Sequence, residues 1–278
     1  MKKYLGLFLC LVFLGAVLAG CGNNAADNGD KEPAAGNTEK TQLVVGATAQ
    51  PHAEILEQIV PILAEEGIEL KVNVFTDYVQ LNPALEEGQI DANFFQHVPY
   101  LDDYNANNNA DLVWTVKVHN EPMGVYSKKI TDIKDLAEGA TVGIPNDATN
   151  GGRALAVLEK AGIIKLKEGA GVTATDADIV ENSKNIEVIM MDAAMLPRTL
   201  DDADICVINS NYALEGGLNP IKDSIFMEDK DSPFANIIAV KKDKKDDPAI
   251  QKLGAALNSP EVKKFIEDTY DGACVPAF

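Results

Sequence analysis

Short apolar runs alternate along the chain with segments whose apolar residues have the spacing of a helix, and this alternation limits the possible folds more than any other feature. The first series comprises expected strands at 43–48, 70–76, 90–94 and 112–118 and expected helices at 51–66, 82–87 and 99–105. Parallel strands need crossover connections, which are usually helices. The order of these elements therefore predicts an α/β fold with a largely parallel sheet.

A second series of the same kind follows residues 121–124. Its expected strands are at 141–144, 186–190 and 204–208, and its expected helices are at 150–161 and 192–200. The pattern changes again near residues 231–234. After that change come an expected strand at 237–240 and two closing helices at 248–258 and 260–270. Two α/β lobes fit this order better than one.

The N-terminus has the form of an export signal. Lysines at positions 2 and 3 precede an apolar run of 14 residues, which ends at two small residues. A bilayer-spanning helix needs about 20 apolar residues. Residues 1–20 are therefore expected to be a signal peptide, and the protein is expected to be exported.

Residues 18–21, Leu-Ala-Gly-Cys, resemble the lipobox of bacterial lipoproteins, in which the cysteine is acylated after cleavage. An ordinary signal followed by a chance cysteine is the alternative to lipidation of Cys21. The residues after Cys21 are polar and offer almost nothing to bury, so residues 21–41 are expected to be a lipidated flexible tether. A coil of roughly 20 residues spans about 25 Å, which would hold the folded part close to the membrane.

The charge of the chain excludes two classes of partner. The sequence has 43 acidic and 24 basic side chains, and its formal net charge is −19. A surface of this sign repels nucleic-acid phosphates and anionic membranes. Small molecules or proteins are therefore the expected partners, with no nucleic acid, and lipid rather than charge is expected to hold the protein to a membrane.

Arg153 and Arg198 are the only arginines among the 24 basic residues. Arg153 follows an expected strand and a polar, glycine-containing loop, in the first turn of an expected helix. The backbone N–H groups and the helix dipole at such a place suit an anion, and a guanidinium group matches a carboxylate with two parallel hydrogen bonds. A structural salt bridge is an equally supported interpretation of Arg153, and Arg198 is expected to be structural.

Aromatic side chains gather in two segments at expected strand ends, 75–78 and 91–100. Aromatic walls with a few polar groups form selective pockets for a small apolar or thioether side chain. The candidate pocket residues are Tyr78, Phe95, His97 and Tyr100. Each aromatic residue taken singly is more often part of a core than of a binding site.

The sequence offers little that would support catalysis or metal binding. His52, His97 and His119 are the only histidines, and none stands at a metal-ligand spacing from another. The G-x-S-x-G, H-E-x-x-H and P-loop motifs are missing from the sequence. We therefore expect no metal, no cofactor and no catalytic residue. Cys206 and Cys274 are expected to be buried free thiols.

Ordered motifs along the expected folded part resemble the methionine-binding lipoproteins of bacterial ABC importers, the NlpA/MetQ family. The stretches that carry the resemblance are PHAEIL (51–56), DANFFQHVPYL (91–101), EPMG (121–124), NGGRAL (150–155), LPR (196–198), INSNYA (208–213), SPFANII (232–238) and VPAF (275–278). So many motifs in one order make chance similarity implausible.

The resemblance implies a two-lobe periplasmic-binding-protein fold of type II, with two crossover strands and the ligand in the interlobe cleft. Lobe 1 would comprise residues 42–122 plus 235–278, and lobe 2 residues 123–234. Arg153 would hold the α-carboxylate of an amino acid, and Asn211 and Asn236 its amino and carboxylate groups. The thioether would lie among the four candidate pocket residues Tyr78, Phe95, His97 and Tyr100.

The function that the resemblance implies is non-enzymatic. A lipid-anchored protein on the extracytoplasmic side of the cell membrane would capture L-methionine and deliver it to an ABC permease, whose ATPase subunit it would contact only indirectly. The alternatives are binding of D-methionine or of a methionine-containing dipeptide, a surface lipoprotein or adhesin that keeps the fold, and an enzyme. The sequence departs from the family pattern at Phe234, where the family usually has tyrosine.

Overall fold

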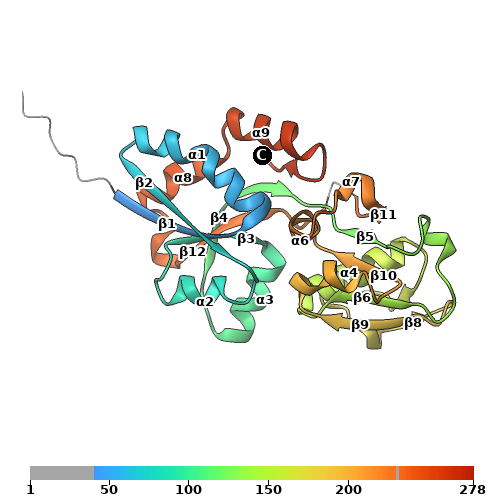
Figure 1. Cartoon of the computed structure of the whole chain (residues 1–278). Helices are drawn as coiled ribbons and strands as arrows, with labels where there is room; N and C mark the ends of the chain where they lie inside the picture. The colour runs from blue at the N-terminus through green and yellow to red at the C-terminus, as the bar shows by residue number, and fades with distance from the viewer. Residues whose placement is uncertain (1–40, 230–231) are drawn as a thin grey trace, which may run out of the picture. The chain divides into compact units, whose positions relative to one another are not determined.

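The structure, a computed structural model, describes residues 41–229 and 232–278 of the 278-residue chain. The expected signal peptide, Cys21 and all but the last residue of the expected tether lie outside the described residues. None of the helices in the described ranges combines the length and the apolar character that a bilayer span requires. The described strands form two main sheets, one in each of two α/β lobes (Figure 1).

The first lobe contains a six-stranded sheet with the order β13-β4-β12-β3-β1-β2. Its strands are β1 (Thr41–Thr48), β2 (Ile68–Phe75), β3 (Ala92–His97), β4 (Val113–Asn120), β12 (Asn236–Val240) and β13 (Val275–Pro276). Strand β1 is parallel to both β2 and β3. Strand β12 is antiparallel to β3 and β4, and β13 is antiparallel to β4.

Helices cover both faces of this sheet, and the side-chain alternation of the strands explains why (Figure 1). In β12, Ile238 and Val240 pack on the face that carries α1, α8 and α9, whereas Ile237 and Ala239 pack on the face that carries α2 and α3. The helices are α1 (Glu54–Glu65), α2 (Leu81–Glu86), α3 (Val98–Asn108), α8 (Pro248–Leu257) and α9 (Pro260–Tyr270).

The second lobe contains a five-stranded sheet with the order β11-β5-β10-β6-β9. Its elements are β5 (Gly124–Tyr126), β6 (Thr141–Pro145), α4 (Ala148–Lys160), β9 (Glu187–Met191), α5 (Leu196–Thr199), β10 (Ile205–Ile208), α6 (Ser210–Glu215), α7 (Pro220–Asp223) and β11 (Ser224–Met227). Helix α4 packs on one face, and α5 and α6 pack on the other. A separate two-stranded sheet pairs β7 (Lys165–Leu166) with β8 (Ile179–Glu181).

Local signals explain where several helices begin. The side chains of Asp147, Asp247 and Ser259 accept backbone N–H groups at the starts of α4, α8 and α9. A proline follows two of these caps directly, at the first helical position of α8 and of α9. The expected helix at 51–66 corresponds to α1, which begins at Glu54, together with the π-helical turn directly before it (Ala49–Ala53), in which only Gln50 has extended backbone angles.

The expectation of a largely parallel sheet was wrong, because both main sheets are mixed. In the second lobe β6 is parallel to β9 and β10, but β5 is antiparallel to β10 and β11. In the first lobe Asn236, at the start of β12, pairs with His97, at the end of β3. The chain returns from the second lobe to this end of the sheet, so β12 can only run antiparallel to β3.

Two connections join the lobes: residues 121–123 between β4 and β5, and the segment between β11 and β12. The strands divide between the lobes as the sequence suggests, apart from Thr41 at the start of β1. The boundaries at 122/123 and 234/235 remain a prediction.

Candidate binding site

A small cavity, with about 20 Å³ of free space, lies between side chains of the two lobes. The lining residues are Tyr78, Phe95, Gln96, His97, Tyr100, Glu121, Asn150, Arg153, Asn209, Ser210, Asn211 and Asn236. All seven residues expected to bind a ligand are among them. Whether these residues bind a ligand remains a prediction, but the fold brings them to one place.

The convergence follows from the direction of the strands. Strand β3 ends at His97, β6 leads into α4 with Asn150 and Arg153, and β10 leads into Asn209 and α6. In α/β sheets, ligand sites form beyond the carboxyl ends of parallel strands. Asn236 joins them from the other direction, because its antiparallel strand starts beside His97.

An aromatic cluster forms one wall of the cavity. The ring centroid of Tyr78 lies 5.6 Å from that of Phe95 and 6.0 Å from that of Tyr100, and those of Phe95 and Tyr100 are 5.6 Å apart. Tyr212 of the second lobe adds a ring 4.7 Å from Tyr78. The Tyr78 hydroxyl donates to Asn211 Oδ1 at 2.5 Å, which links the two lobes directly. Burial raises the pKa of Tyr78 well above its ordinary value, so the hydroxyl keeps its proton.

Arg153 is only 4% exposed and already has a carboxylate partner. Its Nη2 donates to Glu228 Oε2 at 2.6 Å and to the backbone oxygen of Glu121 at 2.7 Å, and its Nε lies 3.2 Å from both Glu228 oxygens. The Phe234 ring covers the guanidinium at 4.3 Å. Within the described residues Nη1 has no hydrogen-bond acceptor. The structural salt bridge is present, and a ligand-binding role for Arg153 remains a prediction.

The N-terminus of α4 differs from the expected open anion site. Asp147 Oδ1 accepts the Asn150 backbone N–H at 2.9 Å and the Asn150 side-chain amide at 3.0 Å. Burial raises the pKa of Asp147. The expectation of free backbone donors was wrong at Asn150, because the capping carboxylate takes that N–H group. The anion-binding potential of this region therefore resides in the Arg153 side chain.

His97 is held in the cavity wall as a neutral ring. Its Nδ1 accepts the Tyr100 backbone N–H at 3.2 Å, and its Nε2 lies 3.2 Å from Asn150 Oδ1. Burial, with a smaller contribution from the charge of Arg153, lowers the pKa of His97 to about 3. With Nδ1 accepting, Nε2 carries the proton and donates to Asn150, which is a second link between the lobes.

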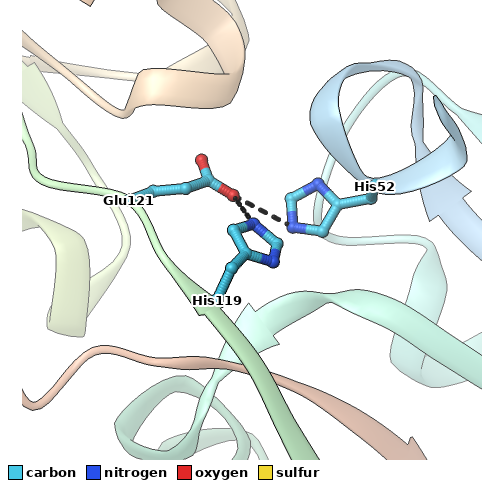
Figure 2. A group of neighbouring side chains, drawn as sticks. All are labelled: His52, His119 and Glu121. Atoms are coloured by element: carbon cyan, nitrogen blue, oxygen red, sulfur yellow. Dashed lines mark hydrogen bonds and ion pairs between the residues drawn. The ribbon is translucent and has the colours of Figure 1, made fainter. Parts of the chain in front are cut away.

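The other two histidines meet at Glu121, beside the cavity (Figure 2). His119 Nε2 lies 2.7 Å and His52 Nε2 lies 3.2 Å from Glu121 Oε1. His52 Nε2 also lies 2.9 Å from Asn236 Oδ1, and His52 Nδ1 lies 2.7 Å from Thr48 Oγ1. All three side chains are buried. The sequence gave no sign that His52 would join His119 and Glu121, because His52 comes from a separate segment, whereas His119 and Glu121 are two residues apart.

These three side chains could approach a metal ion, because their ligand atoms lie within 4.8 Å of one another. Two ligands of a tetrahedral zinc ion, each about 2.1 Å from the metal, are about 3.4 Å apart. The 2.7 Å contact between His119 and Glu121 is shorter than that and is a direct hydrogen bond. The group as it stands therefore matches a hydrogen-bonded carboxylate better than a metal centre.

The sequence reasoning missed Glu121, Asn150 and Glu228 as residues of the site region. Glu121 and Asn150 belong to the quoted motifs EPMG and NGGRAL, so the motifs contained the signal. No sequence signal marked Glu228 as a site residue, because an acidic residue before a turn is common. Arg198 is exposed and is not among the residues that line this cavity. Cys206 and Cys274 are buried free thiols.

Comparison with known proteins agrees with this architecture. The sequence matches the family described as NlpA lipoprotein over residues 43–278. The methionine-binding lipoprotein MetQ of Bacillus subtilis is 44% identical over 281 residues, which cover 99% of this chain and 98% of the relative. The D-methionine-binding lipoprotein MetQ of Salmonella typhimurium is 43% identical over 260 residues, which cover 93% and 92%.

A solved structure shows the same similarity. The structure of a nutrient binding protein from Burkholderia cenocepacia bound to methionine has a TM-score of 0.81 and 46% sequence identity, over 85% of this chain and 100% of that chain. Family match, sequence identity and structural similarity all extend over nearly the whole described fold. The chain therefore belongs to the NlpA lipoprotein family.

Proposed function

We propose that this protein is a substrate-binding protein that captures L-methionine between its lobes and delivers it to an ABC importer. The observation that carries the proposal is the interlobe cavity, which joins an aromatic wall to a buried arginine with a free Nη1 group. The relatives named methionine-binding lipoproteins, and the similar structure bound to methionine, support the choice of amino acid.

Each half of a methionine molecule has a matching part of the cavity. The thioether side chain would lie against Tyr78, Phe95, His97 and Tyr100, because sulfur contacts aromatic rings favourably. Its carboxylate would accept from Arg153 Nη1. The Asn211 Nδ2 group is buried without a hydrogen-bond partner, so it offers a second donor for the ligand.

Binding rather than catalysis is the proposed activity. The Tyr78 hydroxyl and the His97 ring serve as hydrogen-bonding groups between the lobes, and the relatives bear the names of binding proteins. Closure of the two lobes over the ligand would use the contacts Tyr78–Asn211 and His97–Asn150 as links. The captured molecule would leave unchanged when the lobes open at the permease.

A lipid on Cys21 is the proposed anchor to the extracytoplasmic side of the cell membrane, with the ABC permease as direct partner and its ATPase as an indirect one. The lipobox at residues 18–21 and the lipoprotein relatives support this anchor. Replacing Cys21 by alanine should move the protein from the membrane fraction to the soluble fraction, measured by fractionation and immunoblot. Equal membrane retention of both proteins would contradict the anchor.

D-methionine and a methionine-containing dipeptide are the alternative ligands. One relative is named a D-methionine-binding lipoprotein, and Phe234 stands next to Arg153 where the family usually has tyrosine. A surface lipoprotein with an unused cavity is the alternative from a different class of function.

Calorimetric titration of the soluble domain decides among these functions. The domain is unfolded and refolded to remove endogenous ligand, checked by circular dichroism, and titrated with L-methionine, D-methionine, glycyl-methionine and leucine. We expect L-methionine to bind at micromolar concentration or more tightly and leucine to bind much more weakly. A refolded protein that binds none of the four would contradict the proposal and favour the surface-lipoprotein alternative.

The two arginines provide a matched pair of variants. Hydrogen bonds to charged groups contribute about 1.5–3 kcal/mol, so Arg153→Ala should weaken methionine binding by about 10-fold or more. Arg198 is exposed and outside the cavity lining, so Arg198→Ala should change the affinity by less than about 2-fold. Equal affinities of the two folded variants would remove Arg153 from the site.

A further inference from the structure

Glu121 is the only carboxylate among the described residues that line the cavity. We propose that Glu121, fixed in place by His52 and His119, binds the α-ammonium group of the ligand and makes a free amine a requirement for tight binding. This inference rests on the proposed amino-acid-binding function and adds to it the residue that recognises the amine.

The hydrogen bonds of Glu121 leave one carboxylate oxygen available. Both imidazoles approach the same oxygen, Oε1, at 2.7 Å from His119 and 3.2 Å from His52 (Figure 2). Within the described residues Oε2 accepts no hydrogen bond from the protein. The two rings therefore orient the carboxylate and leave its second oxygen for another donor.

The charges around the cavity leave Glu121 without a cationic partner. Arg153 is paired with Glu228 at 2.6 Å and contacts Glu121 only through the backbone oxygen. Burial lowers the pKa of His52 to about 4 although the charge of Glu121 acts in the opposite direction, so this ring is neutral at pH 7. Among the described residues, His119 Nδ1 is buried without a hydrogen-bond partner.

Glu121 nevertheless stays ionised. Burial opposes its ionisation, but the interactions with His52, His119 and Arg153 outweigh burial and hold the pKa below its ordinary value. A buried carboxylate without a paired cation is costly. A ligand that brings its own cation offsets that cost, whereas a ligand without one leaves the charge uncompensated.

The positions of the polar groups match an α-amino acid. Arg153 Nη2 donates to the Glu121 backbone oxygen, so the residue proposed to hold the carboxylate contacts the residue proposed to hold the ammonium. The carboxylate and the ammonium of an amino acid are likewise attached to one carbon atom. Asn236 Oδ1 shares the His52 Nε2 group with Glu121, which places a second acceptor beside the carboxylate for another N–H of the ammonium.

The test compares three ligands on the wild-type domain and on the Glu121→Gln variant. The ligands are L-methionine, 4-(methylthio)butanoate, which lacks the amine, and 3-(methylthio)propylamine, which lacks the carboxylate. Glutamine keeps the size of the side chain and an acceptor for His119 but removes the charge. Glu181→Gln, at an exposed position remote from the cavity lining, is the control for the loss of one negative charge.

We expect Glu121→Gln to weaken both amine-bearing ligands by about 10-fold or more, because a hydrogen bond to a charged group is lost. The affinity for 4-(methylthio)butanoate should stay within about 3-fold, and Glu181→Gln should leave all three affinities unchanged. A uniform loss for all three ligands, or no loss, would overturn the inference. Failure of the wild-type domain to bind methionine would overturn the proposed function as well, so the two failures are distinguishable.

A measurement on the wild-type domain covers the case that Glu121→Gln does not fold. The charged 3-(methylthio)propylamine should bind at least about 10-fold more tightly than the uncharged 3-(methylthio)propanol, which has the same length. Equal affinities for the amine and the alcohol would show that no carboxylate recognises the ammonium group and would overturn the inference.

Discussion

Arg153 shows how one side chain serves stability and recognition at once. Its Nε and Nη2 groups are fixed by Glu228 and by the Glu121 backbone oxygen, and the Phe234 ring lies over the guanidinium. In residues 41–229 and 232–278, Nη1 is the one guanidinium nitrogen without a hydrogen-bond acceptor, and we propose it for the ligand. A guanidinium fixed on one side loses little further entropy on binding, because its orientation is already set.

Removal of Glu228 should therefore destabilise the fold. Both partners of the pair are buried, with side chains 4% and 10% exposed, and breaking a buried pair costs about 3–5 kcal/mol because one charge is left unmatched. We expect Glu228→Gln to lower the free energy of unfolding by an amount of this order in urea denaturation. The exposed pair Lys165–Glu181 is the control, because Glu181→Gln should change stability by less than about 1 kcal/mol.

The buried histidines predict how stability depends on pH. Burial is the main cause that lowers the pKa of His52 to about 4 and that of His97 to about 3, from an ordinary value of 6.5. The unfolded chain therefore binds protons that the folded protein excludes. The free energy of unfolding should fall as the pH falls from 6.5 towards 4, by up to about 1.4 kcal/mol per pH unit for each histidine.

Urea denaturation at pH 7.5, 6.0, 5.0 and 4.5 measures this dependence. Between pH 6 and pH 4.5 the free energy of unfolding of His52→Gln should fall less steeply than that of the wild type, because the variant lacks the contribution of one histidine. This difference in slope is expected whatever the stability of the variant at pH 7.5. Identical slopes for the variant and the wild type would show that His52 is not held neutral by the fold.

At the scale of elements, α4 connects the site to the surface of the second lobe. Gly152 allows its approach to residues 171–174, because a Cβ at this position would lie 2.3 Å from the Val172 backbone oxygen and 2.8 Å from the Ala174 backbone nitrogen. Backbone atoms cannot turn aside as a flexible side chain can. The next residue in α4 is Arg153, so displacement of this helix would also displace the guanidinium.

Substitution of Gly152 should therefore affect both stability and binding. We expect Gly152→Ala to lower the free energy of unfolding by about 1–3 kcal/mol, as overpacking does, and to weaken methionine binding. Ala156 is exposed one turn further along α4, and Ala156→Gln should change stability by less than about 0.5 kcal/mol. If the free energy of unfolding of Gly152→Ala equalled that of the wild type, the 171–174 segment would have to move aside freely.

At the scale of the whole molecule, side chains from both lobes form one apolar cluster. Tyr78, Leu81 and Phe95 of the first lobe pack with Leu196 and Tyr212 of the second. The lobes therefore meet along the same aromatic wall that lines the cavity. A ligand between them would add contacts to both lobes at once, so binding and closure stabilise each other.

A ligand that binds the folded protein alone raises its unfolding temperature. At a methionine concentration 100 times the Kd, the stabilisation is about 2.7 kcal/mol, which for a domain of this size corresponds to a shift of about 5–10 °C. Differential scanning calorimetry of the refolded domain with and without L-methionine measures the shift. Leucine at the same concentration is the control, and an equal shift with leucine would contradict selectivity for methionine.

The strand and helix pattern was predictable because it depends on local spacing. The apolar period identified β1, β6 and β10 and the helices α4, α8 and α9 within a few residues of their bounds. The short strands β5, β11 and β13 were not found, because two to four residues carry no clear period. Their antiparallel pairing depends on where the chain returns from the other lobe, which no local pattern encodes.

The sequence by itself determined the α/β class, the two series of elements, the family resemblance and the residue types of the cavity, because each depends on spacing or on motif. Tertiary structure alone decided which distant residues meet. Glu121 gains its imidazole partner His52, and Arg153 its carboxylate Glu228, from segments far away in the chain. Charge pairing in a buried site depends on separations of a few ångströms, and these distances exist only once the two lobes have folded and packed together.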